Sequence, residues 1–315
     1  MHWLLSGYTS IGATAHLNEL ALSGATLMLP LIQLITVTYH SEQDLKQFLP
    51  SVAAQTSIES VRVQVVDNTG DSGHSELRNI IQAYSFASLR VGAGNLGYYR
   101  AAWRVLRRQI SAGQLPDWSV ICNPDTILDD PAFCSKVIAT YAAHPPAILA
   151  PRILAIPSLR DQNPYMVSRP STLQMHFHKW AYQLDPTGDI TRAAHKVRCA
   201  ICRRDRVPGH SAMHRPKIIY APHGAFTLFH KSFFAAGASF EDVPFLYGEE
   251  IVVAEEARRL NLEIVFDPDL RVRHREHSST ARCPRLEMYC AQAIEYCVSK
   301  YFPWFGRRVS VDATV

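Results

Sequence analysis

Two adjacent glutamates, Glu249 and Glu250, have the residue type and the position that acid–base chemistry requires. They follow the apolar and aromatic segment FLYG at 245–248, and apolar residues recur at helical spacing over 251–260. A helix is therefore predicted to begin at the glutamates, where unpaired backbone N–H groups favour an anionic carboxylate. An ionised carboxylate at the rim of a pocket suits a general base. The alternative is that both are ordinary first-turn acids on a solvent-exposed helix.

The first half of the chain alternates apolar, β-branched runs with helical patterns. Strands are predicted at 31–39, 61–66, 88–91 and 118–122, and helices at 41–54, 75–84, 100–110 and from Pro131 onward. Ser41 followed by Asp44 is typical of a capping box at the start of the first helix. This alternation predicts an α/β domain with a mostly parallel central sheet, helices on both faces and right-handed crossovers.

Polar residues follow the predicted strands. They are Thr38 and Tyr39, Asp67 and Asn68, the glycine loop 92–97, and Asn123 with Asp125. Ligands of open parallel sheets bind beyond the carboxyl ends of the strands, so these groups are expected on one rim. Asp125 suits a hard divalent cation, or alternatively it caps an Asn-Pro-Asp turn. Asp67 suits hydrogen bonds from a base or a ribose, or alternatively it is a turn residue.

The glycine loop matches the pattern GxGxxG with Gly92, Gly94 and Gly97, between a predicted strand and a predicted helix. That is the context of a dinucleotide-binding fingerprint. However, the loop follows the third strand instead of the first, and no acid ends a strand about 20 residues later. We therefore favour backbone N–H groups that approach a phosphate or a sugar, with Arg100 nearby. A nucleotide-dependent oxidoreductase is the rival interpretation, and a copurified cofactor would reveal it.

The second half of the chain is less regular. Strands are predicted at 148–154, 218–220, 225–230, 263–266 and 270–274, and helices at 173–182, from Lys231 and at 284–301. The turn Asp267-Pro268-Asp269 is expected to separate the last two strands. The segment 157–217 is rich in Pro, Arg and His and has no dependable period. Cys283, Cys290 and Cys297 recur every seven residues, which favours buried packing on the last helix over a redox role.

The composition and charge distribution limit the function classes. At 47% hydrophobic and 19% charged residues the chain is predicted to be globular. The net charge of +4 is unevenly spread, because residues 192–217 hold eight Lys or Arg and one acid, and 271–285 hold five Arg. Such basic stretches suit a phosphate or a membrane surface, or are simply solvated. No aromatic residues interleave with them, so nucleic acid is not expected as a partner.

The cellular compartment of the protein is predicted from its cysteines and from its apolar runs. The seven cysteines have irregular spacings that do not indicate a disulfide framework. No apolar run approaches the roughly 18–20 residues of a membrane span. Residues 1–30 lack a basic start and a tidy cleavage site, so they are interpreted as a loosely attached extension. A cytoplasmic protein with one compact domain is expected.

Two groups of histidines offer alternative sites. Cys199, Cys202, His210 and His214 have ligand types and end spacings that suit tetrahedral zinc, although the central gap is shorter than in a zinc finger. The surrounding arginines favour a basic loop instead. His274 and His277 directly follow a predicted strand, and a functional role at the same rim is favoured over two solvent-facing histidines.

These motifs, taken together, resemble glycosyltransferase family 2, and within it the rhamnosyltransferase-like enzymes of bacterial polysaccharide assembly. The resemblance is carried by Thr-Tyr-His at 38–40, Val-Val-Asp-Asn at 65–68, Gly-Asn-Leu-Gly at 94–97, Asn-Pro-Asp at 123–125, Phe-Leu-Tyr-Gly-Glu-Glu at 245–250 and Val-Arg-His-Arg-Glu-His-Ser-Ser-Thr at 272–280. It covers roughly 31–280 and fails at both ends and over much of 158–215. It implies a GT-A fold at 31–283, with a donor half at 31–154 and an acceptor half at 155–283, between the extension and a C-terminal helix and tail at 284–315.

The resemblance also implies site residues. Asp67 would lie at the nucleoside, and Asn95 and Gly97 beside the donor. The segment Asn123-Pro-Asp125 stands where the family carries its Asp-x-Asp motif. Because the first Asp is replaced by Asn123, Asp125 would be the main metal ligand. His274 is a candidate to complete the coordination shell of the metal. Glu250 stands where the family has the Asp that acts as base, and the choice between Glu249 and Glu250 stays open.

The resemblance further implies a nucleotide-diphosphate sugar donor, Mg²⁺ or Mn²⁺, and inversion at the anomeric carbon. The acceptor would be a glycan or a lipid-linked saccharide, recognised in the variable middle segment with Phe177, Trp180 and Tyr182. A lipid-diphosphate acceptor would explain the basic residues and a peripheral contact with the inner face of the membrane. Because Asn123 and Glu250 depart from the family pattern, a catalytically silent nucleotide-sugar-binding module is the alternative.

Overall fold

The structure is a computed structural model that describes residues 32–70, 74–92, 94–184, 214–275 and 285–304. The chain divides into two units, Met1–Pro30 and Leu31–Val315, and every described residue belongs to the second. The division into an extension, a glycosyltransferase domain and a C-terminal helix with a tail stays a prediction.

Among the residues that the structure describes, nine strands form one sheet with the order β3-β2-β1-β4-β8-β6-β9-β5, and β7 also pairs with β9. The strands are β1 Ile32–Thr38, β2 Val61–Asp67, β3 Ala87–Val91, β4 Trp118–Cys122, β5 Thr126–Ile127, β6 Ile148–Ile156, β7 Lys217–Ile219, β8 Phe226–His230 and β9 Ile264–Arg275. The prediction of a mostly parallel sheet is confirmed. Six described strands, β1, β2, β3, β4, β6 and β9, run in one direction, because β8 is antiparallel to both β4 and β6.

Strand β1 is buried along its whole length, as its continuous apolar run predicts. Its side chains alternate between two cores, with Ile32 and Leu34 in one and Ile35 and Val37 in the other. Thr38 lies opposite Asp67 in the parallel register, so the strands end together at one rim. The polar residues that follow these strands are thereby brought to the same edge of the sheet.

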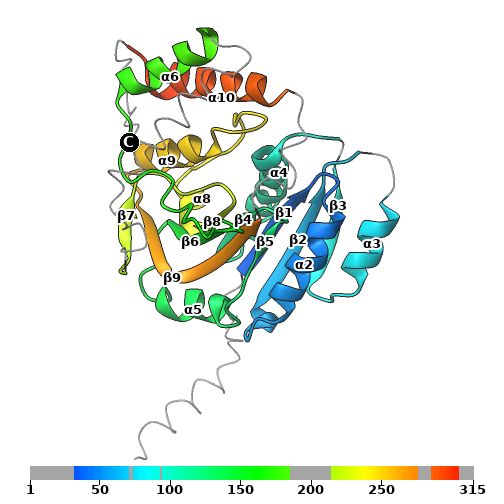
Figure 1. Ribbon diagram of the computed structural model, residues 1–315. Coiled ribbons are helices and arrows are strands. Elements are labelled where there is room, and N and C mark those ends of the chain that lie inside the picture. Colours follow the sequence, from blue (N-terminus) through cyan, green and yellow to red (C-terminus); the bar gives the residue numbers. More distant parts are fainter. Residues whose placement is uncertain (1–31, 71–73, 93, 185–213, 276–284, 305–315) are drawn as a thin grey trace, which may run out of the picture. The chain divides into compact units, whose positions relative to one another are not determined.

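Helices cover both faces of the sheet (Figure 1). The helices are α2 Glu42–Ala53, α3 Ser75–Gln82, α4 Tyr98–Ser111, α5 Phe133–Thr140, α6 Thr172–Leu184, α8 Lys231–Ala235, α9 Glu249–Arg259 and α10 Leu286–Tyr301, with a 3₁₀ turn at Ile58–Ser60. Apolar residues of α2, α3 and α5 fill one core, and those of α4, α8 and α9 fill the other. This arrangement places α9, which carries the two glutamates, over the α4 side of the sheet.

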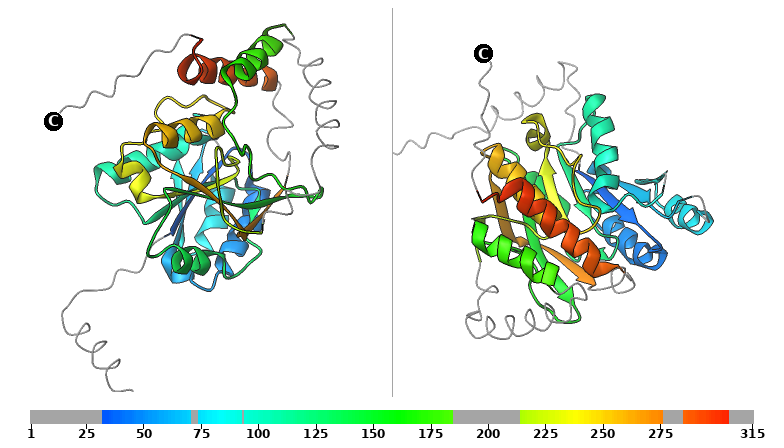
Figure 2. Two further views of the ribbon diagram at one scale, coloured as in Figure 1. Left: turned by 90° about the vertical axis from the view of Figure 1, so that its left-hand side faces the viewer. Right: turned by 90° about the horizontal axis from the view of Figure 1, so that it is seen from above.

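Helices α6 and α10 lie side by side beyond α9, and the view from above in Figure 2 shows them as neighbours. Lys179 of α6 donates a hydrogen bond to Glu295 of α10 (2.8 Å), and the ring of His176 contacts the carbonyl of Phe302 (2.9 Å). Met175 and Ile251 share a small core with Cys297, Val298 and Phe302. Helix α6 therefore reaches the rest of the domain largely through α10.

Two local predictions are wrong. Asp267-Pro268-Asp269 does not end a strand, because β9 continues from Ile264 to Arg275 and a register shift opposite Pro151 and Arg152 accommodates the extra residues. Ser41 does not cap α2 through its side chain; its hydroxyl donates instead to the carbonyl of Tyr39 (3.2 Å). Among the described residues, no helix combines the length and apolar character that crossing a bilayer requires.

Candidate active site

The carboxyl ends of β1 and β2 are tied together by the backbone that follows them. The amide of Asn68 donates to the carbonyl of Thr38 (2.8 Å), and the amide of Gly92 donates to that of Asp67 (2.7 Å). The side-chain amide of Asn68 then donates to the carbonyl of Gly97 (3.1 Å). The glycine loop is thus fixed against the end of β2 and lies on the rim that the sequence indicates.

Gly97 brings the glycine loop into contact with the segment before the glutamates. Its amide donates to Oδ1 of Asn95 (3.0 Å), and its φ of 83° lies in the left-handed region. A Cβ added there would lie 1.9 Å from the carbonyl oxygen of Phe245, so only glycine fits. The loop that carries Asn95 and the loop that leads to Glu249 therefore pack backbone to backbone.

Asp67 is buried, and both its carboxylate oxygens contact the turn that follows β2. Oδ1 accepts from the amide (2.9 Å) and the hydroxyl of Thr69, and Oδ2 contacts Nδ1 of His74 (2.5 Å). These contacts tie the carboxylate to Thr69 and His74, which follow β2 in the chain. Its contact with a nucleoside stays a prediction.

Glu249 and Glu250 begin α9 and lie against Gly224, the residue two positions before β8. The amide of Gly224 donates to Oε1 of Glu250 (3.3 Å). A Cβ added at Gly224 would lie 3.0 Å from Cγ and Oε1 of Glu249 and 3.2 Å from Oε1 of Glu250. Both carboxyl groups therefore face the same backbone, and a side chain at position 224 would displace them.

The glutamates do not titrate as ordinary surface acids. Burial raises the pKa of Glu250, while its own backbone N–H and that of Gly224 favour its ionised form. Burial first, and then the charge of Glu250, raise the pKa of Glu249 well above its usual range. Because a hydrogen bond from Gly224 favours the anion at Glu250, this residue is the better candidate for the ionised member of the pair.

Asp125 and His274 form the second pair of chemically competent groups. Nε2 of His274 lies 3.2 Å from Oδ1 of Asp125, and its Nδ1 lies 2.7 Å from Oε1 of Gln162. The side-chain amide of Asn123 lies 3.4 Å from the same Nε2. With a proton on Nδ1 that is donated to Gln162, Nε2 can accept from the side-chain amide of Asn123. Nε2 and the carboxylate oxygen of Asp125 then face each other as two acceptors.

The segment 223–225 lies between the two pairs. The amide of Asn123 donates to the carbonyl of Ala225 (2.8 Å), and the ring of His223 lies 5.9 Å from that of His274. Gly224 touches the glutamates, as described above, and its carbonyl accepts from the hydroxyl of Tyr98 (3.3 Å). The structure thus brings Asp125 and Glu250 to one site, although they lie far apart in sequence.

The environment of Tyr98 shows the same convergence. Burial first, and then the charges of neighbouring acidic groups including Glu249 and Asp125, raise the pKa of Tyr98 well above its usual value. The pKa of Tyr165 is raised first by the charge of Glu250, and then by burial and Glu249. Both phenols therefore stay neutral, and the single O–H of Tyr98 is donated to the carbonyl of Gly224.

Sequence reasoning missed the residues that hold this arrangement together. They are Tyr98, Gln162, Asn163, His223 and Gly224. The buried Asn163 accepts from the amide of His223 (2.7 Å) and donates to the carbonyl of Pro151 (2.8 Å). The partners of Tyr98, Gln162 and Asn163 lie 12 to 126 residues away in sequence, so no local pattern identifies them. The only available signal was a polar Asp-Gln-Asn run in an otherwise irregular segment.

Three other predicted residues are placed as follows. Thr38 is buried and its hydroxyl contacts the carbonyl of Val66 (3.4 Å). Tyr39 is 49% exposed and lies against the ring of His40. Nε of Arg100 donates to the carbonyl of Val243 (2.5 Å), so this side chain holds the loop before α9. Tyr39 is therefore accessible to a ligand, whereas Arg100 is engaged with the protein backbone.

Helix α10 packs against the segment that precedes the glutamates. A Cβ at Gly248 would lie 3.2 Å from the sulfur of Cys297, and the ring centroids of Tyr289 and Phe245 lie 4.8 Å apart with their planes tilted by 40°. Burial raises the pKa of Cys297 to about 12, with the glutamates adding to the shift, so this thiol is inert. Cys297 is buried as expected and Cys290 is half-buried.

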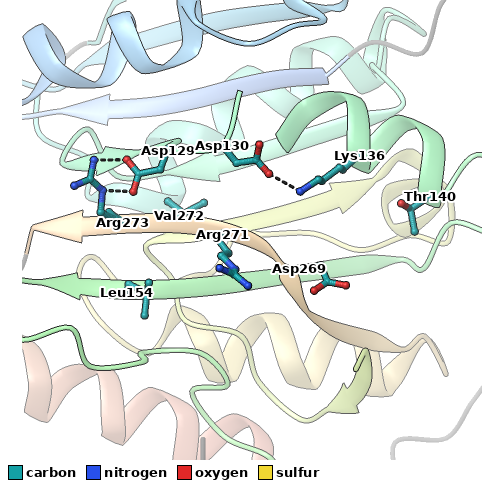
Figure 3. A pocket seen from close by; sticks show the side chains of 9 residues that line it. All are labelled: Asp129, Asp130, Lys136, Thr140, Leu154, Asp269, Arg271, Val272 and Arg273. Atoms are coloured by element: carbon teal, nitrogen blue, oxygen red, sulfur yellow. Dashed lines mark hydrogen bonds and ion pairs between the residues drawn. The ribbon is translucent and has the colours of Figure 1, made fainter. Parts of the chain in front are cut away.

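A separate cavity of about 700 Å³ lies at the β5–β9 edge (Figure 3). It is lined by Asp129, Asp130, Lys136, Thr140, Leu154, Asp269, Arg271, Val272 and Arg273. Arg273 pairs with Asp129, and Lys136 with Asp130. Since neighbouring side chains of a strand point to opposite faces, Arg273 and His274 face different sides of β9. This cavity contains none of the candidate site residues.

Three other predicted site residues, Cys199, Cys202 and His210, together with His277 and Cys283, lie outside the described residues. Among the residues that the structure describes, no group of three His, Cys, Asp or Glu is arranged to hold a metal ion. The Asp125–His274 pair therefore supplies two protein ligands at most within the described part of the chain.

The fold is similar to that of solved glycosyltransferases. It is similar to GalNAc-T7, solved with UDP, GalNAc and Mn²⁺, with a TM-score of 0.57 and 12% identity over 87% of this chain and 50% of that one. It is also similar to the mannosyltransferase PcManGT from Pyrobaculum calidifontis, in complex with GDP-Man and Mn²⁺, with a TM-score of 0.50 and 14% identity over 85% of this chain and 65% of that one. The chain has the GT-A fold of these glycosyltransferases, as predicted.

A third structure, TarS residues 1–349 from S. aureus, matches with a TM-score of 0.49 and 13% identity over 78% of this chain and 60% of that one. The chain thus spans between half and two thirds of the length of the structures it matches. No protein-family model matches the sequence, and no curated protein matches it either.

Proposed function

We propose that this chain is a metal-dependent, inverting glycosyltransferase. It would move a sugar from a nucleotide-diphosphate donor to a hydroxyl of a glycan or lipid-linked saccharide in polysaccharide assembly. The observation that supports this most strongly is the position of the Glu249–Glu250 pair and the Asp125–His274 pair on either side of 223–225. A transferase of this kind needs a base for the acceptor and a charge-compensating group for the leaving diphosphate within one site.

The ligand atoms of the Asp125–His274 pair are of the types that bind a divalent cation. The pair offers a carboxylate oxygen and an imidazole nitrogen that face each other, and Gln162 holds the second ring nitrogen. Mg²⁺ and Mn²⁺ are commonly held by a few protein ligands, with diphosphate oxygens and water completing the shell. When bound, the metal would offset negative charge on the leaving diphosphate. Asn123 at the family's first acidic position accounts for the small number of protein ligands.

Glu250 is the proposed base. Its ionised carboxylate would accept the proton of the acceptor hydroxyl as the hydroxyl oxygen bonds to the anomeric carbon. The bond from that carbon to the diphosphate oxygen breaks, and its electron pair leaves with the nucleoside diphosphate. Attack on the face opposite the leaving group inverts the configuration. Glu249, whose pKa is raised further, would be the neutral neighbour that limits like-charge repulsion.

The donor would bind along the rim of the parallel strands. The residues proposed for this contact are Thr38, Tyr39, Asp67, Asn68, Asn95, Gly97, Arg100 and Asn123. The hydrogen bonds of the Asn68 and Asn95 side chains to Gly97, and that of the Gly92 amide to Asp67, preorganise this rim before the donor arrives. Rhamnose is the first donor sugar to test, since the sequence resembles rhamnosyltransferases. Acceptor recognition is proposed on the side of the middle segment with Phe177, Trp180 and Tyr182.

The experiment is sugar transfer from a panel of labelled nucleoside diphosphate sugars, with Mg²⁺, with Mn²⁺ and with a chelator. We expect transfer from one donor class, dependence on the metal, and a product of inverted anomeric configuration. Saturable donor binding without transfer or hydrolysis would instead favour the nucleotide-sugar-binding module. That second candidate is favoured by Asn123 and by the absence of a third metal ligand among the described residues.

A further inference from the structure

Tyr165 is an exposed aromatic residue in the segment between β6 and α6. It is 46% exposed, and its hydroxyl has no hydrogen-bond partner among the residues that the structure describes. A single exposed tyrosine is ordinary on a protein surface, so its meaning depends on what surrounds it. Tyr165 is distinguished by its position beside the proposed base and by the way the backbone holds it.

The ring of Tyr165 contacts the residue that precedes Gly224. Its centroid lies 5.9 Å from that of His223, and the amide of the next residue, Gly224, donates to Glu250 (3.3 Å). The charge of Glu250 is also the first cause that raises the pKa of Tyr165, ahead of burial and of Glu249. Both observations place Tyr165 beside Glu250. Because the phenol stays neutral there, its O–H remains a hydrogen-bond donor.

Hydrogen bonds hold the backbone on both sides of Tyr165. Two residues before it, the buried Asn163 accepts from the amide of His223 (2.7 Å) and donates to a carbonyl of β6 (2.8 Å). One residue after it, Met166 and Ala221 exchange backbone hydrogen bonds of 3.1 and 3.0 Å. An aromatic side chain on a fixed backbone loses little conformational entropy when it binds a ligand, so Tyr165 is preorganised for contact.

The ring of Tyr165 has an open face. Its plane and that of His223 are nearly perpendicular, at 82°, so His223 covers one face of the Tyr165 ring at most. The face of an aromatic ring is negatively polarised and attracts groups with partial positive charge. The C–H groups on one side of a pyranose sugar are such groups, and its oxygens accept from a phenol O–H. Tyr165 therefore offers both a stacking surface and a donor to a pyranose.

The position of Tyr165 suits the acceptor sugar and not the donor. A general base must lie within hydrogen-bond distance of the hydroxyl that it deprotonates, so the acceptor sugar must lie beside Glu250. Tyr182, on the proposed acceptor side, also raises the pKa of Tyr165. The ring of His223 lies 5.9 Å from both Tyr165 and the proposed metal ligand His274. One ring therefore connects the acceptor contact to the proposed site of the leaving diphosphate.

We propose that Tyr165 is a specificity-determining residue for the acceptor. Its ring stacks on the pyranose that carries the reacting hydroxyl, and its phenol O–H donates to an oxygen of that sugar. This inference rests on the proposed function and adds a contact to the same site. The contact itself is measured without a donor, so its failure is distinguishable from failure of the transferase.

The test is saturation-transfer NMR of the full chain with methyl pyranosides of glucose, galactose, mannose and rhamnose. We expect wild type to bind at least one of them, with saturation strongest on the C–H protons of one sugar face. Tyr165→Ala should weaken its affinity about tenfold, and Tyr165→Phe, which keeps the ring, about threefold at most. The control is Ile218→Ala on β7, a 56% exposed apolar residue outside the site, which should leave binding unchanged.

Turnover supplies a second measurement with the pyranoside that binds. In Tyr165→Ala the KM for this acceptor should rise about tenfold, while hydrolysis of the donor by water stays as in wild type, because water needs no stacking surface. A residue with a merely structural role would instead lower both rates together. Thermal melting of each variant shows that it is folded.

Three results would overturn the proposal. The first is a wild-type chain that binds none of these pyranosides. The second is Tyr165→Ala with the affinity and the acceptor KM of wild type, which would leave the transferase in place. The third is Tyr165→Phe that binds as weakly as Tyr165→Ala, because the ring would then contribute nothing. Pyranoside binding that depends on Tyr165, without transfer from any donor, would refute the transferase and leave the saccharide contact in place.

Discussion

The backbone amide of Gly224 donates a hydrogen bond to Oε1 of Glu250 at 3.3 Å. This contact joins the start of β8, which also borders Asn123, to the first turn of α9. It favours the ionised form of Glu250 in an environment that otherwise raises its pKa. The same amide therefore positions the proposed base and keeps it able to accept a proton.

Substitution of Gly224 by alanine should damage turnover more than stability. The added Cβ would lie 3.0 Å from Glu249 and 3.2 Å from Glu250, so both carboxyl groups would have to shift. A displacement of this kind should lower kcat by about tenfold to a hundredfold. Gly113→Ala is the control for backbone strain alone: its φ of 63° disfavours a side chain although a Cβ there meets nothing within 4 Å, so it should lower stability and leave kcat unchanged. Equal kcat values for wild type and Gly224→Ala would show that the site tolerates the shift.

The glutamate pair should make the protein less stable as the pH rises. Because burial raises both pKa values in the folded state, folding favours the protonated forms. Their contribution to stability is therefore complete below the unfolded pKa and is lost as the pH rises through the folded values. Glu249→Gln removes one ionisable group, so it should raise Tm relative to wild type at about pH 8 and less at about pH 4.

Thermal melting across this pH range measures the effect. The exposed Glu263, replaced by glutamine, is the control and should show no such difference. A Tm gain for Glu249→Gln that is larger at the acidic end would mean that the carboxyl group is stabilised as an anion. That outcome would contradict the account of burial and mutual repulsion given for this pair.

Replacement of Asp125 by asparagine should weaken donor binding that depends on metal. Its carboxylate faces Nε2 of His274 at 3.2 Å, and loss of the charge removes the stronger of the two proposed ligands. We expect donor affinity in Mn²⁺ to fall about tenfold or more, to the value of wild type in chelator. Calorimetric titration of donor measures this. A variant whose donor affinity still responds to Mn²⁺ would place the metal elsewhere.

The strands and the helix of the glutamates could be predicted because their signals are local. Strand β1 is a continuous run of apolar and β-branched residues, and apolar residues recur at helical spacing after Glu249. Each of these two elements can therefore be predicted from its own residues alone. The same reasoning wrongly predicted that the segment around Pro268 ends a strand. A bulge in β9 accommodates this segment where β9 pairs with β6, and the sequence alone does not show that pairing.

The contacts that complete the site could not be predicted, because they join residues distant in sequence. Gln162 holds His274, and Asn163 holds His223, across separations of 112 and 60 residues. No period or turn signal links such partners. Asp67 could be identified from the sequence as a candidate residue, but its contacts to Thr69 and His74 could not be predicted.

The most direct test of the proposed mechanism is the separation of turnover from donor binding in Glu250→Gln. Glutamine keeps the size of the side chain and can still accept from Gly224, but it cannot take the acceptor proton. We predict that kcat falls by ~10²–10⁴ while donor affinity stays within about twofold of wild type. Glu249→Gln, measured alongside, should retain more activity. Near-normal kcat in Glu250→Gln would contradict its role as base, and an inactive Glu249→Gln beside it would move that role by one residue.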